Sequence, residues 1–200
     1  MSGADPIRVD HHDWHSASYV DDWIARDVTR DEERRLRLRQ MLAAAPVAPD
    51  AEIAVLDVGG GYGVVTEEVV RAFPRAVVTL QDYSQPMLEH ARQRLADYHE
   101  RVRYVLGDLR DPGWSRAVEG PFDLAVSAIA IHNLRHLGEI AASYRAIAGV
   151  LKPGGAFLDY DLFGLIGGVE EQIESFRQAG FTAVECLWQQ ERLAILRAIR

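Results

Sequence analysis

Along most of the chain, short runs of apolar residues alternate with longer stretches in which apolar and polar residues mix. The short runs predict buried strands at residues 53–57, 76–80, 102–106, 122–127 and 156–160. The longer stretches predict helices near residues 64–73, 86–98, 112–118, 135–149 and 169–179. Largely apolar strands separated by helices are typical of a parallel sheet covered on both faces. The pattern therefore predicts an α/β fold with a doubly wound, mostly parallel sheet.

The alternation of strands and helices ends near the C-terminus. Residues 182–188 and 192–199 are both strand-like, and only three residues separate them. A connection this short can join antiparallel strands, whereas a parallel crossover needs about a dozen residues or more. We therefore predict a seven-stranded sheet that ends in an antiparallel β-hairpin. A sheet of this kind binds its ligand at the carboxyl ends of the strands.

Residues 11–45, which precede the first predicted strand, show helical patterning in two pieces. Thr29 and Glu32 fit a capping box that starts the second piece, and Lys152-Pro-Gly-Gly155 further on fits a sharp turn into the fifth strand. We divide the chain into residues 1–49, a helical lid or appendage, and residues 50–200, the main domain. We expect a chain beginning at Pro46 to fold on its own. The second piece mixes acidic residues with four arginines, which predicts a solvated helix face: Arg34, Arg35, Arg37 and Arg39.

Composition narrows the class of protein and its surroundings. Two hundred residues suit one globular domain, and no apolar run reaches the roughly 18 residues that cross a bilayer. The formal charge of −8 argues against a nucleic-acid partner, because phosphate backbones are bound largely by lysine and arginine. Cys186 is the only cysteine, and the acidic N-terminus does not begin like a signal peptide. We expect a cytoplasmic protein without a membrane partner.

A glycine-rich segment directly follows the first predicted strand and opens a helix. Gly59, Gly61 and Gly63 permit positive φ angles and let the backbone approach a ligand without obstruction. The third glycine of the dinucleotide fingerprint Gly-x-Gly-x-x-Gly is missing. Asp57 stands just before the loop, where a carboxylate would repel a pyrophosphate and attract an ammonium or sulfonium group. The alternative is that these glycines only form a tight turn and bind no ligand.

Two further acidic residues follow the next strands. Asp82 ends the second predicted strand, where a carboxylate can accept hydrogen bonds from both hydroxyls of a ribose. Asp108, after the third strand, could accept from an adenine amino group. Each residue could instead serve only its own turn or cap a helix. Together they favour a nucleoside ligand without identifying it.

Taken in order, these motifs resemble the class I S-adenosylmethionine-dependent methyltransferases over about residues 50–200. The matching segments are Asp57-x-Gly59-x-Gly61-x-Gly63, Asp82-Tyr83-Ser84-x-x-Met87-Leu88, Gly107-Asp108, residues 122–127, residues 151–155 and the terminal hairpin. The resemblance implies a Rossmann-like methyltransferase fold and S-adenosylmethionine as the cofactor.

The family's pattern also implies a role for each matching position. Asp57 would hold the methionine ammonium, and the three glycines would line the methionine part. Asp82 would bind the ribose and Asp108 the adenine amino group. Four other residues would lie beside the cofactor: Tyr83, Met87, Leu109 and Ser127. Tyr83 and Met87 could equally be ordinary core residues.

The acceptor site should lie beyond the fourth strand, near His132 and Asn133. This segment resembles the small-molecule branch of the family, in which a histidine commonly occurs here. His132 is therefore our candidate general base. The alternative is that His132 and Asn133 cap the next helix or hold a loop. Holding the acceptor in line with the sulfonium could by itself supply most of the rate acceleration.

The N-terminal stretch is rich in aromatic and histidine side chains. Tyr19 is our candidate for reaching the cofactor pocket from a lid, and the spacing of His11, His12 and His15 matches no metal site. Only residues 161–168 separate the fifth strand from the next helix. Either the N-terminal helices and the partner of a homodimer cover the acceptor, or the site is unusually open.

The leading interpretation is methyl transfer from S-adenosylmethionine to a small-molecule acceptor. The short segment after the fifth strand favours one rival, a protein that binds the cofactor without robust catalysis. Methylation of a protein or RNA is a second rival, and a nicotinamide-dependent oxidoreductase is a third. The missing third glycine and Asp57 oppose the oxidoreductase.

Overall fold

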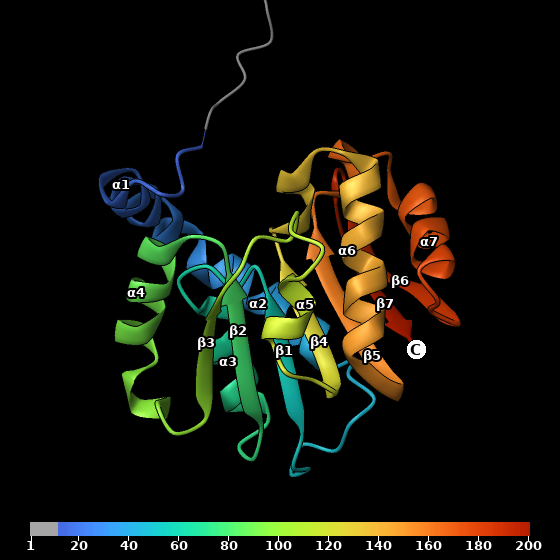
Figure 1. The fold of residues 1–200 in the computed structure, drawn as a ribbon, viewed down its shortest axis with the longest axis horizontal. Helices are drawn as coiled ribbons and strands as arrows, with labels where there is room; N and C mark the ends of the chain where they lie inside the picture. Colours follow the sequence, from blue (N-terminus) through green and yellow to red (C-terminus); the bar gives the residue numbers. More distant parts are fainter. Residues whose placement is uncertain (1–11) are drawn as a thin grey trace, which may run out of the picture.

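A computed structural model describes residues 12–200 of the chain, apart from the side chains of residues 30 and 31. Its centre is one seven-stranded sheet in the order β3-β2-β1-β4-β5-β7-β6 (Figure 1). β1 to β5 run parallel, whereas β7 is antiparallel to both β5 and β6. The strands are β1 (Ala54–Val58), β2 (Val77–Asp82), β3 (Val102–Leu106), β4 (Phe122–Ala128), β5 (Leu151–Asp161), β6 (Ala183–Gln190) and β7 (Leu193–Ile199). The predicted doubly wound sheet and C-terminal hairpin are confirmed.

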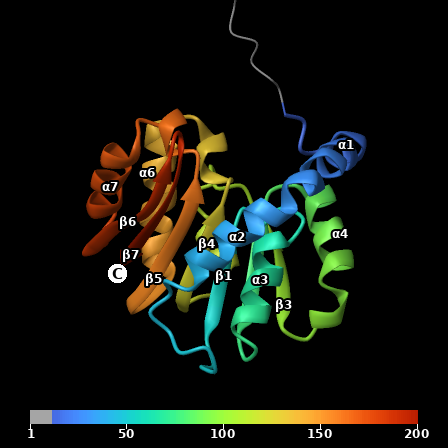
Figure 2. The same cartoon turned by 180° about the vertical axis from the view of Figure 1, so that it is seen from behind.

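Helices cover both faces of the sheet. One face carries α2 (Asp31–Leu42), α3 (Val64–Ala72) and α4 (Gln85–Arg94) (Figure 2). The opposite face carries α5 (Trp114–Ala117), α6 (Leu137–Val150) and α7 (Val169–Gln178) (Figure 1). The remaining 3-10 segments are η1 (Val28–Arg30), η2 (Ala96–Tyr98), η3 (Ile131–Leu134) and η4 (Phe163–Leu165). Each face has its own hydrophobic core, because strands apolar on both sides must be buried on both.

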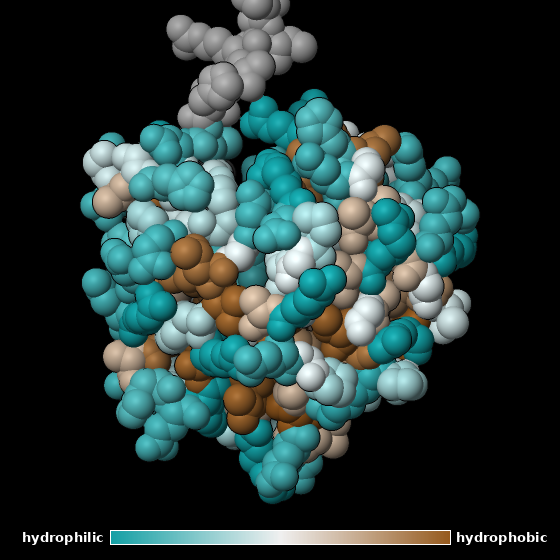
Figure 3. Space-filling model, viewed as in Figure 1, coloured by the Kyte–Doolittle hydropathy of each residue, from teal (hydrophilic) through white to brown (hydrophobic). Residues whose placement is uncertain are grey.

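The face that carries α5 has a short helical cover at that point, because α5 has only four residues. Apolar side chains accordingly reach the surface of this face in separate patches between polar regions (Figure 3). No helix within residues 12–200 is long and apolar enough to span a bilayer.

The two N-terminal helices occupy different places. α1 (Ala17–Asp27) lies at the end of α4, where Asp21 contacts His90 at 2.7 Å (Figure 1). α2 instead packs against α3 and the sheet, and its Leu38 and Met41 are fully buried. Residues 31–42 are therefore part of the cover of the sheet, although the sequence pattern placed them in an appendage.

Three local predictions were wrong. Thr29 does not cap the second helix, because it lies in η1 and its hydroxyl donates to the Arg26 carbonyl at 2.7 Å. α5 begins after Gly113 rather than at residue 112, and the Asp111 carboxylate accepts from the Gly113 amide. The predicted sharp turn at residues 152–155 lies inside β5, where the pairing with β4 shifts from Phe122–Leu151 to Leu124–Ala156 and Gly154 has a φ angle of 78°.

The third correction concerns the arginines of α2. Arg34 and Arg35 are only 16% exposed, because they face carboxylates of α1 and α3 rather than solvent. Arg37 lies over the Trp188 ring at 4.2 Å. Of the four, Arg39 is the one that is mostly exposed, and it too pairs with Glu68. Charged residues spaced regularly along a helix predict a solvent-exposed face only when no other helix packs against that face.

Candidate functional site

The glycine-rich loop joins β1 to α3 at the carboxyl edge of the sheet. Gly59, Gly61 and Gly63 all have positive φ angles, of 64°, 53° and 89°. A side chain at Gly59 would meet Ala130, and one at Gly63 would meet Leu95, so both positions also need the small residue. At Gly61 a Cβ would find no atom within 4 Å. The loop is therefore tightly packed at its ends and open at its middle, where a ligand could lie against the backbone.

Gln81 connects the ends of three strands, and the sequence analysis missed it. Its Oε1 accepts from the Gly59 amide at 3.1 Å, and its Nε2 donates to the Gly107 carbonyl at 2.5 Å. Its own carbonyl accepts from the Gly60 amide at 2.9 Å. One buried amide side chain thus holds the loop after β1 and the turn after β3. A glutamine inside an otherwise apolar strand was the available signal.

Asp57 lies beneath the loop and is fully buried. Its Oδ2 accepts from the Thr66 hydroxyl at 2.6 Å, whereas Oδ1 has no hydrogen-bond partner among the described residues. Burial raises the pKa of Asp57 to about 7, and the nearby Asp82 carboxylate adds to this rise. An unpaired buried oxygen costs free energy unless a ligand supplies the missing donor. A cationic group at this position would stabilise the ionised carboxylate.

Asp82 ends β2 beside the same loop. Its Oδ2 accepts from the Gly61 amide at 2.9 Å and its Oδ1 from the Ser84 amide at 2.8 Å. Burial raises the pKa of Asp82, although hydrogen bonds from the backbone of Ser84, Gly61 and Tyr83 oppose the rise. An ionised carboxylate has about four acceptor positions, so these bonds leave acceptor capacity for a ligand. Asp57, Asp82 and the loop therefore form one connected group.

The other predicted cofactor residues surround this group with different exposure. Met87 is buried in the core, and Tyr83 is half-buried with the His15 ring edge-on at 5.2 Å. Asp108 is 44% exposed and accepts from the Arg110 amide. Leu109 packs against the hydrophobic core on the face that carries α5, α6 and α7. Ser127 is fully buried, and its hydroxyl donates to the Val58 carbonyl at 3.0 Å. Ser127 thus has a structural bond, and cofactor contact by any of these residues stays a prediction.

A histidine–carboxylate pair lies at the end of β4 and β5. His132, in η3, places Nδ1 2.6 Å from Asp161 Oδ1, and its backbone amide donates to Asp161 Oδ2 at 2.9 Å. The Leu162 amide also donates to Asp161. With Nδ1 engaged by Asp161, Nε2 is the ring nitrogen left for an acceptor. His132 does not cap α6, which begins after His136.

Asp159 lies two residues before Asp161 in β5 and is also fully buried. Neither of its carboxylate oxygens has a hydrogen-bond partner in the described part of the chain. Burial, and then the neighbouring Asp161, raise the pKa of Asp159 well above its usual range. Both effects disfavour the ionised form of Asp159. The sequence analysis singled out neither residue, because two acids in a buried strand have no local signature.

His132 lines a cavity of about 470 Å³. The other described lining residues come from the N-terminal segment, η3 and the segment after β5: His12, Asn133, Arg135, Leu162 and Leu165. His12 contacts the Tyr19 hydroxyl, and the Tyr19 ring packs edge-on against Trp14 at 5.5 Å. The N-terminal segment therefore reaches the cavity through His12, with Tyr19 behind it. No cluster of three or more potential metal ligands occurs within residues 12–200; His11 lies outside the described residues.

Comparison with known families and curated proteins finds similarity to methyltransferases. The profile of a family described as a methyltransferase domain matches residues 55–155. A trans-aconitate 2-methyltransferase from Rhodopseudomonas palustris is 33% identical over 135 residues, covering 67% of this chain and 48% of the relative. A malonyl-[acyl-carrier protein] O-methyltransferase from Priestia megaterium is 28% identical over 113 residues, covering 56% and 38%.

Solved structures show the same fold at lower identity. An O-methyltransferase family protein from Burkholderia thailandensis superimposes with a TM-score of 0.70 at 22% identity, covering 88% of this chain and 59% of that one. Human N-acetylserotonin methyltransferase, solved in complex with S-adenosylmethionine, gives 0.72 at 17% identity, covering 94% and 57%. The chain spans less than half the length of the two curated relatives described above.

Proposed function

Because the chain belongs to the methyltransferase-domain family, we propose that it transfers a methyl group from S-adenosylmethionine to a small-molecule acceptor. The acceptor would occupy the cavity lined by His132, in keeping with the trans-aconitate named in one relative and the malonyl group, on an acyl-carrier protein, named in another. Asp57, Gly59, Gly61, Gly63 and Asp82 would hold the cofactor. Residues 50–200 together with α2 would form the catalytic domain, and the part of residues 1–49 that precedes α2 would act as its lid.

The observation that carries the proposal is the unpaired oxygen of Asp57 beneath the open middle of the loop. A buried carboxylate with a vacant acceptor position suits the methionine ammonium of the cofactor. The same carboxylate would repel the pyrophosphate of a dinucleotide. Asp82, at the next strand end, keeps acceptor capacity for ribose hydroxyls. The donor and acceptor chemistry of these residues therefore fits S-adenosylmethionine better than NAD.

When bound, the cofactor would supply an electrophilic methyl group on a sulfonium sulfur. The residues of the chain would then hold the acceptor and remove its proton. Asp161 fixes His132 in the form that carries a proton on Nδ1, so that Nε2 can accept the proton of a hydroxyl. A new bond would form between the acceptor oxygen and the methyl carbon as the carbon–sulfur bond breaks. The proton would pass to His132, and S-adenosylhomocysteine would leave.

A second candidate function is cofactor binding without catalysis. It is favoured by the short segment between β5 and α7, residues 162–168, which leaves little chain to cover an acceptor. The His132–Asp161 pair favours the enzyme instead. A protein that only binds the cofactor has no need for an oriented imidazole beside a cavity.

Two measurements test the proposal. Titration calorimetry with S-adenosylhomocysteine should show binding, and NAD should show none. Incubation with methyl-labelled S-adenosylmethionine and a small-molecule extract should transfer label to a soluble product, and the His132→Ala variant is the control. Binding of NAD with no response to S-adenosylhomocysteine would refute the proposal. Binding without transfer to any extract fraction would favour the second candidate.

A further inference from the structure

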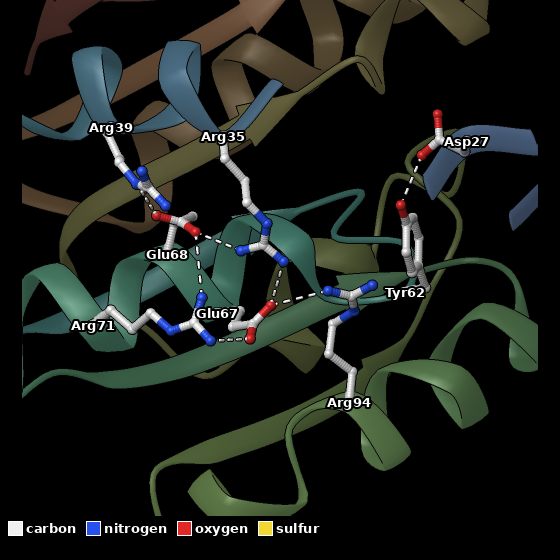
Figure 4. Close-up of polar contacts among 8 residues, drawn as sticks. All are labelled: Asp27, Arg35, Arg39, Tyr62, Glu67, Glu68, Arg71 and Arg94. Carbon is white, nitrogen blue, oxygen red and sulfur yellow. Dashed lines mark hydrogen bonds and ion pairs between the residues drawn. The ribbon is translucent and has the colours of Figure 1, made fainter. Parts of the chain in front are cut away.

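Tyr62 stands between Gly61 and Gly63 in the glycine-rich loop, and its side chain points away from the sheet toward the N-terminal helices (Figure 4). It is 5% exposed, and its hydroxyl donates to Asp27 Oδ2 at 2.8 Å. Asp27 is the last residue of α1 and is itself buried. A single buried hydrogen bond thus joins the middle of the loop to the junction between α1 and α2.

Both partners of this bond are held by further contacts. Arg34, on α2, binds both carboxylate oxygens of Asp27. The guanidinium of Arg94, on α4, lies 4.7 Å above the Tyr62 ring, and the Trp23 ring packs edge-on at 6.1 Å. A two-pronged arginine–carboxylate pair fixes the direction of the carboxylate as well as its distance. Asp27 is therefore a fixed anchor for Tyr62.

α2, which carries Arg34, is clamped to α3 by a second set of ion pairs (Figure 4). Arg35 bridges Glu67 and Glu68, with a distance of 2.7 Å to Glu67, and Arg39 contacts Glu68 at 2.9 Å. Arg94 contacts Glu67 at 2.9 Å, and Arg71 completes the cluster. Although burial opposes it, hydrogen bonds from these arginines lower the pKa of both glutamates, which stay ionised at neutral pH. Because α3 begins directly after Gly63, the clamp and the Tyr62–Asp27 bond hold opposite ends of the same short segment.

We infer that Tyr62 is a positioning residue for the cofactor loop, and that its bond to Asp27 makes the placement of the loop depend on the α1–α2 junction. Tyr62 acts through the backbone of Gly61 and Gly63 on either side, without contacting the reacting atoms. On the other side of the loop, Gln81 and Asp82 bind the backbone amides of Gly59, Gly60 and Gly61. The loop is thus held between β2 and the N-terminal helices. The ligand in this inference rests on the proposed function, but the contact itself does not.

The decisive variant is Tyr62→Phe, which keeps the ring and its contact with Arg94 and removes only the hydroxyl. In the ligand-free full chain, we expect amide exchange at Gly61 and Gly63 to accelerate about five-fold, the factor that one hydrogen bond typically supplies. The affinity for S-adenosylhomocysteine should fall by about the same factor, mainly through faster dissociation. In the Tyr62→Phe background, Asp27→Asn should weaken binding less than it does alone, because the bond is already lost.

Tyr98→Phe is the matched control, because Arg101 lies over its ring at 5.4 Å and no described residue is hydrogen-bonded to its hydroxyl. It should change neither exchange nor affinity. Unchanged exchange at Gly61 and Gly63 in Tyr62→Phe would overturn the inference, as would an acceleration that extends equally to β5, since that reflects general destabilisation. A wild-type chain that fails to bind S-adenosylhomocysteine would refute the proposed function alone, because the exchange experiment uses no ligand.

Discussion

The loop after β1 and the histidine segment after β4 lie at the same edge of the sheet, yet they are held in different ways. Side chains from β2, α1, α2 and α4 brace the loop directly or through Asp27, and most of these contacts are buried. His132 depends on one carboxylate, that of Asp161, and faces a cavity covered in part by the N-terminal segment. Many contacts make a site that is fixed before its ligand arrives, whereas one pair makes a site whose chemistry a single substitution can remove.

We expect the largest effect from deleting the N-terminal helices, which hold the loop and cover the sheet. Deleting residues 1–45 removes Leu38 and Met41 from the core and strips Glu67 and Glu68 of two arginine partners. Removing even one buried leucine typically costs about 2–5 kcal/mol. Contrary to our expectation from the sequence, we now expect the shortened chain not to fold, as circular dichroism and thermal melting would show.

A chain that begins at Ala17 is the control for this deletion. It retains α1 and α2 and loses only contacts such as that between the Ser84 hydroxyl and the Trp14 carbonyl. We expect it to melt cooperatively. If residues 46–200 melted at the temperature of the intact chain, α2 would not be a structural part of the domain.

The second largest effect should come from the His132–Asp161 pair. His132→Ala should lower kcat by about 10²–10⁴-fold, the usual contribution of a general base. Asp161→Asn should lower it in the same range, because an amide no longer selects the imidazole form with a proton on Nδ1. S-Adenosylhomocysteine affinity should be unchanged in both variants. Undiminished turnover in a folded His132→Ala chain would assign His132 a purely structural role.

Substitution at the loop should have an intermediate effect on binding. Asp82→Ala removes the acceptor for Gly61 and the expected ribose contact, and should weaken cofactor binding by about 1–3 kcal/mol. The fold should survive, because Asp82 lies at the end of a strand. Calorimetry measures the loss, and Asp108→Ala, at a more exposed position, is the comparison. Equal affinity of wild type and Asp82→Ala would place the ribose elsewhere.

The smallest predicted effect is a dependence on pH at Asp57. Its pKa of about 7 means that, below pH 7, the proton must leave before the carboxylate can attract an ammonium. Affinity for S-adenosylhomocysteine should therefore be about ten-fold lower at pH 6 than at pH 8. Asp57→Asn should bind weakly and without this slope. A flat profile in the wild type would exclude Asp57 as the group that titrates.

The same shift has a consequence for stability in the ligand-free chain. The folded state holds the Asp57 proton more tightly than the unfolded chain, in which the pKa is near 3.8. The contribution of Asp57 to the free energy of unfolding should therefore fall as pH rises from about 4 to 7 and then level off. Asp57→Asn should remove this part of the pH dependence in denaturant titrations.

Much of this protein follows from the sequence alone, for a local reason. Apolar runs and helical periodicity depend on residues that are neighbours in the chain, so they predicted the sheet, the hairpin and the layers of helices. The positive φ angles of Gly59, Gly61 and Gly63 are likewise a property of single residues. Asp57 and Asp82 could be placed at one edge because parallel strands end together.

Other features needed the tertiary structure, because they join residues that no sequence spacing relates. Asp161 meets His132 across 29 positions, and Tyr62 meets Asp27 across 35. The arginines of α2 read as a solvated face until α3 placed Glu67 and Glu68 opposite them. Whether a charge faces water or a partner depends on which helix packs beside it. Local pattern determined the elements and the edge where a ligand would bind; packing alone decided what holds that edge in place.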